Sequence, residues 1–322
     1  MGAPGDMTRA VLACGEVRTC LLRSSRPLDV GAAEQLLRLR TDERVLVSQR
    51  PNSYVLSPDT LTGVDCRLPT SNGSKVRAVG TVAARAVLTE GRLLQASAYF
   101  RAPAAGPDER QPWGHYLVRP GLVEPFGKLP GEATAQGVLA GCRRGELDLG
   151  QITEGLLTRV LRHPLIDNKV PMKSRHTQLR WAALPSPAGC GPSIERFTVA
   201  DDELRTLLLR VPDGTEPAVV AGLSEDLARH DWLLTTLARL LGSSRLGSTD
   251  GPGTMDVLRP AVDHLLHLWM PGARVHRSLA PLWDVLEREP GFSRQWQTLV
   301  HRIRDQLAVL AIPLPRDQLT TR

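Results

Sequence analysis

Residues 77–101 read RAVGTVAARAVLTEGRLLQASAYFR, two runs rich in Val, Ala and Leu that are joined by residues 89–91. A three-residue connection with Gly at the position that needs a positive φ is a common closure of a β-hairpin. We therefore predict a long antiparallel pair of strands over residues 77–88 and 92–101. Alternation along the second strand places two sets of side chains on opposite faces: Leu94, Ala96, Ala98 and Phe100 on one, and Gln95, Ser97 and Tyr99 on the other.

The sequence around this hairpin carries further signals of short strands. We predict strands over residues 17–22, 44–49, 54–56 and 64–68, and a second hairpin over residues 113–126. In that hairpin, Pro120 and Gly121 fit the two central positions of a type II turn. Two helices interrupt the strands, one over residues 30–40 and one over residues 150–162.

A change of pattern follows the segment PSPAGCGP at residues 185–192, which fits neither a regular helix nor a regular strand. From Asp201 onward the apolar residues recur with helical spacing. We expect helices over residues 202–211, 217–241, 255–269, 279–288 and 292–310, with a mobile Gly- and Ser-rich loop over residues 242–253. The last helix has the most regular apolar stripe: Phe292, Trp296, Leu299, Ile303, Leu307 and Leu310.

These patterns predict an α+β protein. A flexible N-terminus over residues 1–15 precedes a β-rich, antiparallel domain over residues 16–197 with two helices, and an all-helical domain follows over residues 198–322. The length of 322 residues, about twice the ~150 residues that serve as a prior for one domain, fits this division.

The formal net charge of +6 is a weak guide to a polyanionic partner. Of the 40 basic residues 36 are Arg, and this bias, together with abundant Ala, Gly, Leu and Pro, is typical of a high-GC actinobacterial genome. The chain lacks the ~20-residue apolar run of a membrane span and the charge pattern of a signal peptide, so we expect a cytoplasmic protein. Five cysteines without a C-x-x-C pair indicate reduced, mostly buried thiols.

Searches for catalytic motifs find no phosphate-binding loop, nucleophile elbow, H-E-x-x-H pair or dinucleotide fingerprint. The sequence therefore predicts no cofactor. His264 and His267, which follow Asp263 in a D-H-x-x-H pattern, share a helix face and could chelate one ion with a third ligand. Their neighbours are Leu and Trp, as is usual for core histidines, so we predict no metal site.

The strongest basic cluster is the candidate binding site, and it holds two of the four lysines. Its residues are Lys169, Lys173, Arg175, His176, Arg180 and Trp181. Basic side chains beside a Trp could grip a phosphate backbone and stack a base. The alternative, which such segments more often prove to be, is a solvated loop that leads into a strand.

Two other groups of residues and one cysteine carry weaker hypotheses. Asp65, His115 and His176 in the β-rich part could form an unfamiliar enzyme site if they converge in one pocket, although the sequence identifies no catalytic residue. Cys190 lies between two glycines and is best explained as a tolerated loop cysteine. Four tryptophans in the helical part could mark a binding surface if two or more are exposed together, with core packing the commoner role: Trp232, Trp269, Trp283 and Trp296.

Several segments resemble an uncharacterised streptomycete and actinobacterial protein family. They are residues 15–19 (GEVRT), 61–67 (LTGVDCR), 86–92 (AVLTEGR), 258–269 (LRPAVDHLLHLW) and 294–296 (RQW), and the resemblance covers nearly the whole chain. Genes of that family lie beside genes for a variant P-loop protein and a methyltransferase that uses S-adenosylmethionine. The resemblance implies that this protein acts together with an NTP-using partner. It supplies no catalytic residues.

Three functions remain open at the level of sequence. The first is a non-enzymatic interaction or regulatory component of a multi-protein system, with partners from the same gene neighbourhood. The second is an enzyme with an unrecognised site in the β-rich domain. The third is a nucleic-acid-binding protein that uses residues 169–181. No membrane partner is expected.

The nucleic-acid hypothesis makes a direct prediction. If residues 169–181 bind a phosphate backbone, the affinity for a single-stranded oligonucleotide falls steeply as salt rises from about 50 to 200 mM, because counterions are released on binding. Fluorescence anisotropy of a labelled oligonucleotide measures this, and a flat salt response would argue against the hypothesis.

Overall fold

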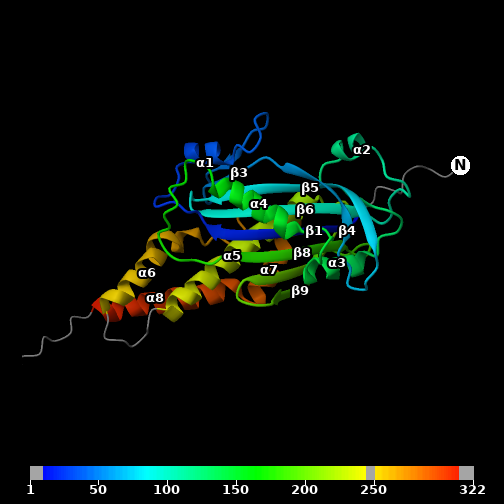
Figure 1. Ribbon diagram of the computed structural model, residues 1–322. Coiled ribbons are helices and arrows are strands. Elements are labelled where there is room, and N and C mark those ends of the chain that lie inside the picture. Colours follow the sequence, from blue (N-terminus) through cyan, green and yellow to red (C-terminus); the bar gives the residue numbers. More distant parts are fainter. Residues whose placement is uncertain (1–9, 244–250, 312–322) are drawn as a thin grey trace, which may run out of the picture.

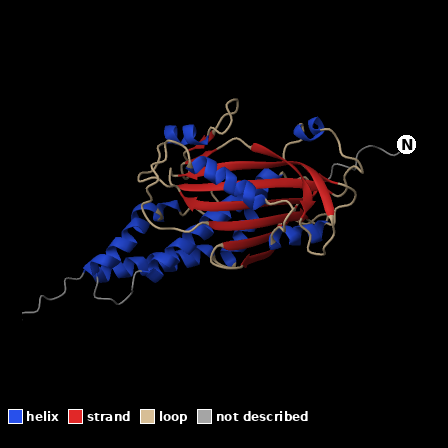
Figure 2. Ribbon diagram, viewed as in Figure 1, coloured by secondary structure: helices blue, strands red, loops and turns tan. Residues whose placement is uncertain are grey.

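The computed structural model describes residues 10–243 and 251–311, and it confirms the α+β fold. Figure 2 shows one broad, twisted sheet with helices on both sides and a group of helices that projects beyond one end of it. The described strands belong to a single ten-stranded sheet in the order β2-β3-β5-β6-β1-β8-β10-β9, with β4 and β7 each paired to β5.

The centre of the sheet is built by the three longest strands, β1 (Ala10–Leu21), β5 (Val76–Thr89) and β6 (Leu93–Pro103). The other strands are β2 (Leu46–Ser48), β3 (Tyr54–Leu56), β4 (Thr60–Leu68), β7 (Val123–Pro125), β8 (Thr177–Pro185), β9 (Ser193–Val199) and β10 (Leu204–Val211). Every pairing between these strands is antiparallel except that of β10 with β8. A parallel pair needs a crossover, so the chain reaches β10 from β8 by way of β9.

The predicted hairpin is confirmed as β5 and β6, whose register runs from Thr89 opposite Leu93 to Ala83 opposite Tyr99. Its turn contains two residues with positive φ, Glu90 at 50° and Gly91 at 59°. A Cβ atom on Gly91 would lie 2.0 Å from the carbonyl oxygen of Leu28. Gly91 is therefore required both by its φ and by this close approach.

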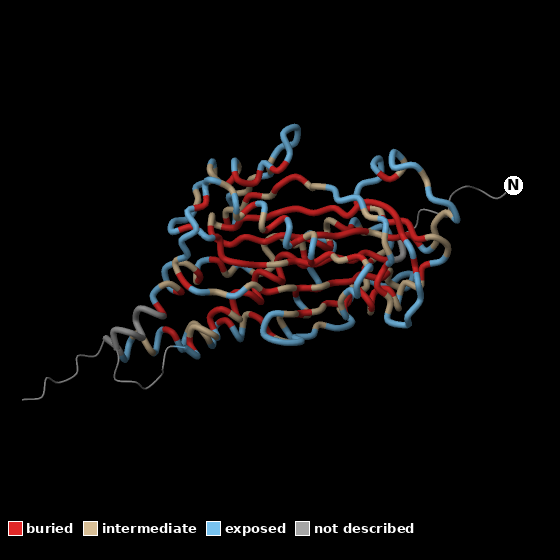
Figure 3. The backbone as a smooth tube through the Cα atoms, viewed as in Figure 1, coloured by how far each residue is buried: buried red, intermediate tan, exposed pale blue. Residues whose placement is uncertain are grey.

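Both faces of the sheet are covered, as Figure 1 shows. On one face lie α1 (Val30–Leu37), α3 (Gly131–Ala140) and α4 (Leu149–Leu161), which share one core with the predicted set of Leu94, Ala96, Ala98 and Phe100. Tyr99 points to the opposite face and belongs to a second core, under the C-terminal helices. This double cover explains why the central strands are buried along their length in Figure 3.

The C-terminal helices agree with four of the five predicted segments. They are α5 (Pro217–Ser243), α6 (Gly251–His264), α7 (Ala280–Arg288) and α8 (Phe292–Ala311), with short 3-10 turns at Leu266–Leu268 and Arg277–Leu279. Among the residues with described burial, the predicted stripe of α8 packs inward at Phe292, Trp296 and Ile303.

The helix predicted over residues 202–211 is wrong, because this segment forms β10. Its leucines recur at a spacing that suits either a helix or a strand buried on both faces. In the structure Leu208 packs into one core, and Leu207 and Leu209 pack into the other. The expected domain boundary at residue 198 falls within β9, and the sheet continues past it to Val211.

The hairpin predicted over residues 113–126 is also wrong. Trp113–Leu117 form the short helix α2, and β7 pairs with β5 rather than with this segment. The turn itself is present, since Leu122 N–H donates to the Arg119 carbonyl over 3.2 Å and Gly121 has a φ of 70°. Pro120 and Gly121 thus predicted the turn correctly, but they did not show that a helix rather than a strand precedes it.

Two expectations of flexibility concern residues that are partly outside the described ranges. The N-terminus was expected to be flexible to residue 15, but residues 10–15 belong to β1, where Cys14 lies opposite Phe100. Residues 1–9 lie outside the description. In the expected loop over residues 242–253, α5 ends at Ser243, residues 244–250 are outside the description, and α6 begins at Gly251. Within the described chain, no helix combines the length and apolar character needed to cross a bilayer.

Gly15 in β1 provides a test of this packing. A Cβ atom there would lie 2.4 Å from ring carbons of Trp181, which is fully buried. We expect Gly15→Ala to lower the free energy of unfolding by about 1–3 kcal/mol, because the rigid indole must shift within a packed core. Urea denaturation measures this.

The matched control is Gly155→Ala in α4, where an added Cβ has no atom within 4 Å. Because Ala has the higher helix propensity, this change should raise stability by about 0.5–1 kcal/mol. Equal effects of the two substitutions would contradict the packing described here.

Candidate functional site

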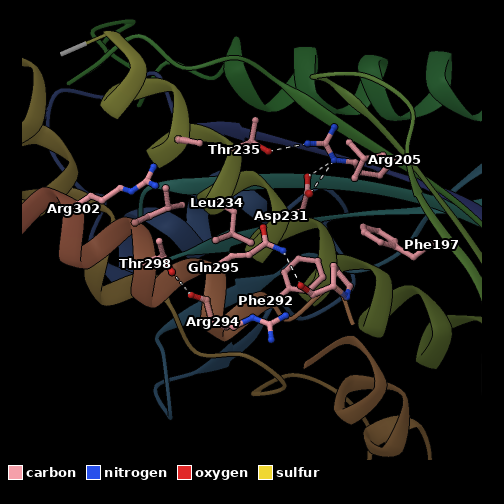
Figure 4. A pocket seen from close by; sticks show the side chains of 14 residues that line it. Phe197, Arg205, Asp231, Leu234, Thr235, Phe292, Arg294, Gln295, Thr298 and Arg302 are labelled. Atoms are coloured by element: carbon pink, nitrogen blue, oxygen red, sulfur yellow. Dashed lines mark hydrogen bonds and ion pairs between the residues drawn. The ribbon is translucent and has the colours of Figure 1, made fainter. Parts of the chain in front are cut away.

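A groove between α5, α8 and the outer strand β9 is the candidate site, and Figure 4 shows it from close by. We call it the α5–α8 groove. It has a volume of about 640 Å³. This volume lies within the range of about 300–1,000 Å³ found for ligand pockets.

The floor of the groove is apolar. It is formed by Phe197 and Val199 of β9, Leu234 of α5 and Leu299 of α8. The rings of Phe197 and Phe292 lie 5.9 Å apart, which joins the edge of the sheet to the start of α8. Val199 is 57% exposed, so part of this apolar surface faces solvent.

A buried ion pair closes the inner wall. Arg205 Nε of β10 lies 2.9 Å from the Asp231 carboxylate of α5, and Arg205 Nη2 donates to Thr235 Oγ1 over 2.9 Å. Burial raises the pKa of Asp231, and the charge and hydrogen bond of Arg205 oppose that rise. Asp231 is the acidic side chain of the groove lining, and its carboxylate is already occupied by Arg205.

The rim of the groove is basic. Arg294 and Arg302 on α8 are exposed, line the groove, and form no ion pair within residues 10–243 and 251–311. They lie off the buried stripe of α8, so they face solvent and the groove rather than the core. Since Asp231 is paired with Arg205, the described lining of the groove carries the positive charges of Arg294 and Arg302 over an apolar floor.

Charged residues in the middle of α5 fix this helix against the sheet. Glu225 is fully buried and accepts from Arg85 Nε of β5 over 2.7 Å and from Arg274 Nη2 over 2.9 Å. The next residue, Asp226, pairs with Arg229 over 2.6 Å and accepts from the backbone N–H of Gly272 over 2.8 Å. These contacts hold the α5 wall of the groove in one position.

The predicted basic cluster is dispersed by the structure. Lys169, Lys173 and Arg175 are exposed, with Arg175 paired to Glu203 over 3.1 Å, and burial lowers the pKa of His176. Arg180 and Trp181 are neighbours on β8 and therefore point to opposite faces of the sheet.

Arg180 lies 3.4 Å from the buried carboxylate of Glu16 and lines a polar cleft beside α3. Trp181 is fully buried in the core under α5, where it cannot stack a base. A binding role for the exposed Lys and Arg side chains stays a prediction, but it has no Trp platform.

The three residues of the enzyme hypothesis do not meet in one pocket. Asp65 is held by Arg77 and Arg110, over 3.0 and 3.1 Å. His115 lies in a separate cleft of about 730 Å³, where its Nε2 is 3.0 Å from Glu124. His176 lies directly before β8 and does not line the cleft that contains His115.

The four tryptophans of the helical part serve packing, whereas the histidine pair does not occupy the expected core position: His264 is half-buried and His267 is exposed. Trp232, Trp283 and Trp296 are buried, and Trp269 stacks on Trp296 at 4.4 Å between ring centroids. The condition for a Trp binding surface is therefore not met. In the described chain no group of three or more His, Cys, Asp or Glu residues could hold a metal ion, and neither His264 nor His267 belongs to such a group.

The cysteines are free, but fewer are buried than expected. Cys14 and Cys20 are buried, Cys66 is half-buried, and Cys142 and Cys190 are exposed. Burial raises the pKa of Cys142, with a further contribution from Asp148, so this exposed thiol is not activated.

The α5–α8 groove could not be predicted from the sequence. No strand was expected at β9 and a helix was expected at β10, so no apolar floor was expected there. The only available signal was the pair Arg294 and Arg302, which the α8 pattern places off the apolar stripe.

Comparison of the chain with protein-family models, curated proteins and solved structures gives no significant match.

His230 supplies a pH test of how firmly α5 is fixed. Its Nδ1–H donates to the Asp226 carbonyl over 2.7 Å, and its Nε2 accepts from Met270 N–H over 3.3 Å, an arrangement that requires neutral imidazole. Burial lowers the pKa of His230 from 6.5 to about 4. Between pH 6.5 and 4 the unfolded chain binds a proton on this histidine and the folded protein does not. The contribution of His230 to the free energy of unfolding is therefore complete above pH 6.5 and is lost as the pH falls towards 4.

We expect wild-type protein to lose stability relative to His230→Asn by about 1.4 kcal/mol for each pH unit between 6.5 and 4. Urea denaturation at pH 7 and pH 5 measures the difference, and the exposed His301→Asn is the control that should follow the wild type. Parallel pH profiles for wild type and His230→Asn would show that His230 is not held neutral.

Proposed function

We propose that this chain is a non-enzymatic interaction component that binds an acidic segment of a partner protein in the α5–α8 groove. The observation that carries the proposal is the combination of an apolar floor with two arginines, Arg294 and Arg302, that form no ion pair in the part of the chain that the structure describes. A segment that alternates acidic and apolar side chains complements both features.

Charge argues for an acidic partner. Asp231 lies inside the groove but is neutralised by Arg205, so it does not repel an incoming carboxylate. Arg side chains bind carboxylates with two parallel hydrogen bonds, and this geometry adds specificity as well as attraction. Complementary charge also accelerates encounter with the partner.

The apolar floor argues for a protein segment rather than a free ion. Phe197 and Leu299 are partly buried and Val199 is largely exposed, so an apolar side chain that covers them gains further burial. Each Å² of apolar surface removed from water contributes about 25 cal/mol. A free inorganic anion would leave this surface uncovered.

The family resemblance identifies candidate partners. In the family that the chain resembles, the neighbouring genes encode a variant P-loop protein and a methyltransferase, and the NTP-using P-loop protein is the first partner to test. A cytoplasmic location is part of this proposal. An interaction component needs a stable docking surface, and the buried ion pairs of α5 hold the groove wall in place.

The two other functions receive less support from the geometry. Nucleic-acid binding by residues 169–181 loses its stacking platform because Trp181 is buried. The enzyme hypothesis receives less support because Asp65, His115 and His176 do not meet in one pocket.

The proposal predicts that charge reversal on the rim weakens partner binding. We expect Arg294→Glu combined with Arg302→Glu to raise the Kd for the partner protein that a neighbouring gene encodes by at least about tenfold. This change is equivalent to about 1.4 kcal/mol of binding free energy. Isothermal titration calorimetry with the purified P-loop protein and with the methyltransferase measures this. Both residues are exposed, so the fold should be unaffected.

Arg304→Glu is the matched control. Arg304 is also an exposed arginine of α8, but it does not line the groove. It should leave the Kd within about twofold of the wild type. If neither neighbour-encoded protein binds, or if Arg304→Glu weakens binding as much as the double variant, the groove is not the binding site.

A further inference from the structure

The outer strand β9 has one free edge beside the groove. Within the described residues β9 pairs with β10 alone, and it ends the strand order of the sheet. The outer backbone groups of such a strand lack partners and form a template for another strand.

The register of β9 shows which backbone groups are free. Ala200 N–H donates to the Leu204 carbonyl over 3.0 Å, so Ala200 faces β10. In an antiparallel pair, residues alternate between those that bond the neighbouring strand and those that face away. Thr198, opposite Thr206, therefore bonds β10, and the N–H and C=O groups of Phe197 and Val199 point outward.

The two halves of β9 differ in how the edge is protected. Glu195 is the extra residue at a register shift and is paired with Arg210, and Arg196 donates to Gln136 over 2.6 Å. A bulge and engaged charges are common devices that prevent strand addition. Residues 197–199 carry neither device, and this unprotected half is the part that lines the groove.

The side chains and the free backbone groups of this half belong to the same residues. Phe197 and Val199 place their side chains on the groove floor and their unpaired backbone groups at the sheet edge. A strand added there would lie about 4.8 Å away, with every second side chain on the groove face. Arg294 and Arg302 line the same groove as that face.

We propose that the acidic segment of the partner binds as an additional β-strand along Phe197–Val199. This inference rests on the proposed function and specifies the conformation of the bound segment. Backbone hydrogen bonds to Phe197 and Val199 supply affinity, while alternate side chains of the segment reach the apolar floor and the two arginines. Strand addition of this kind is an established mode of peptide recognition.

The experiment uses two synthetic peptides of equal composition with the full-length chain. In the first peptide, Glu and Val alternate over nine residues. In the second, the same residues are rearranged with helical spacing, so that they form one apolar face on a helix. Amide exchange of the isotope-labelled chain, followed by NMR, is measured free and with each peptide.

We expect the alternating peptide to bind at least about tenfold more tightly than the rearranged one. At saturation it should slow the exchange of the Phe197 and Val199 amides by at least about tenfold. The Thr198 amide should exchange slowly with and without peptide, because it already bonds β10, and it is the internal control.

Two outcomes overturn strand addition, and they differ in what they mean for the proposed function. If a peptide binds, and Arg294→Glu with Arg302→Glu abolishes that binding, but the Phe197 and Val199 amides stay unprotected, the groove is used without strand addition. If neither peptide binds at millimolar concentration, strand addition is rejected, and calorimetry with the neighbour-encoded proteins decides the proposed function separately.

Discussion

The fully buried carboxylate of Glu225, held between Arg85 and Arg274, is the constraint on which the rest of the structure depends. It joins a strand of the sheet, the long helix α5 and the segment after α6 at one point. Losing one partner of a buried ion pair typically costs about 3–5 kcal/mol, because the remaining charge stays away from water. The position of α5 on the sheet is therefore fixed by charge as well as by the burial of its leucines.

The groove follows from that constraint. With α5 held at Glu225, Leu234 and Thr235 lie two to three turns further along the same helix, beside the last two strands. Arg205 of β10 then meets Asp231, and this second buried pair ties the edge of the sheet to the helix. The apolar stripe of α8 packs on the other side, which leaves its arginines facing outward. The positive charge at the rim is a consequence of how these three elements meet.

Sequence reasoning found what is encoded locally. The turn at Glu90 and Gly91 and the stripe of α8 are each specified within about 25 residues, and both were predicted. The segment around Leu207–Leu209 was misassigned because a strand covered on both faces needs no alternation, so its pattern resembles that of a buried helix. The groove and the burial of Trp181 could not be predicted, since both depend on which distant segments pair.

The contact between Gly15 and Trp181 also has an evolutionary consequence. The indole occupies the space that a side chain on β1 would need, so the two positions share one volume. Substitutions at either position should be tolerated only with a compensating change at the other: a larger residue at position 15 requires a smaller one at position 181. Homologues of this sequence should therefore vary at these two positions together, although the positions lie 166 residue numbers apart in the chain.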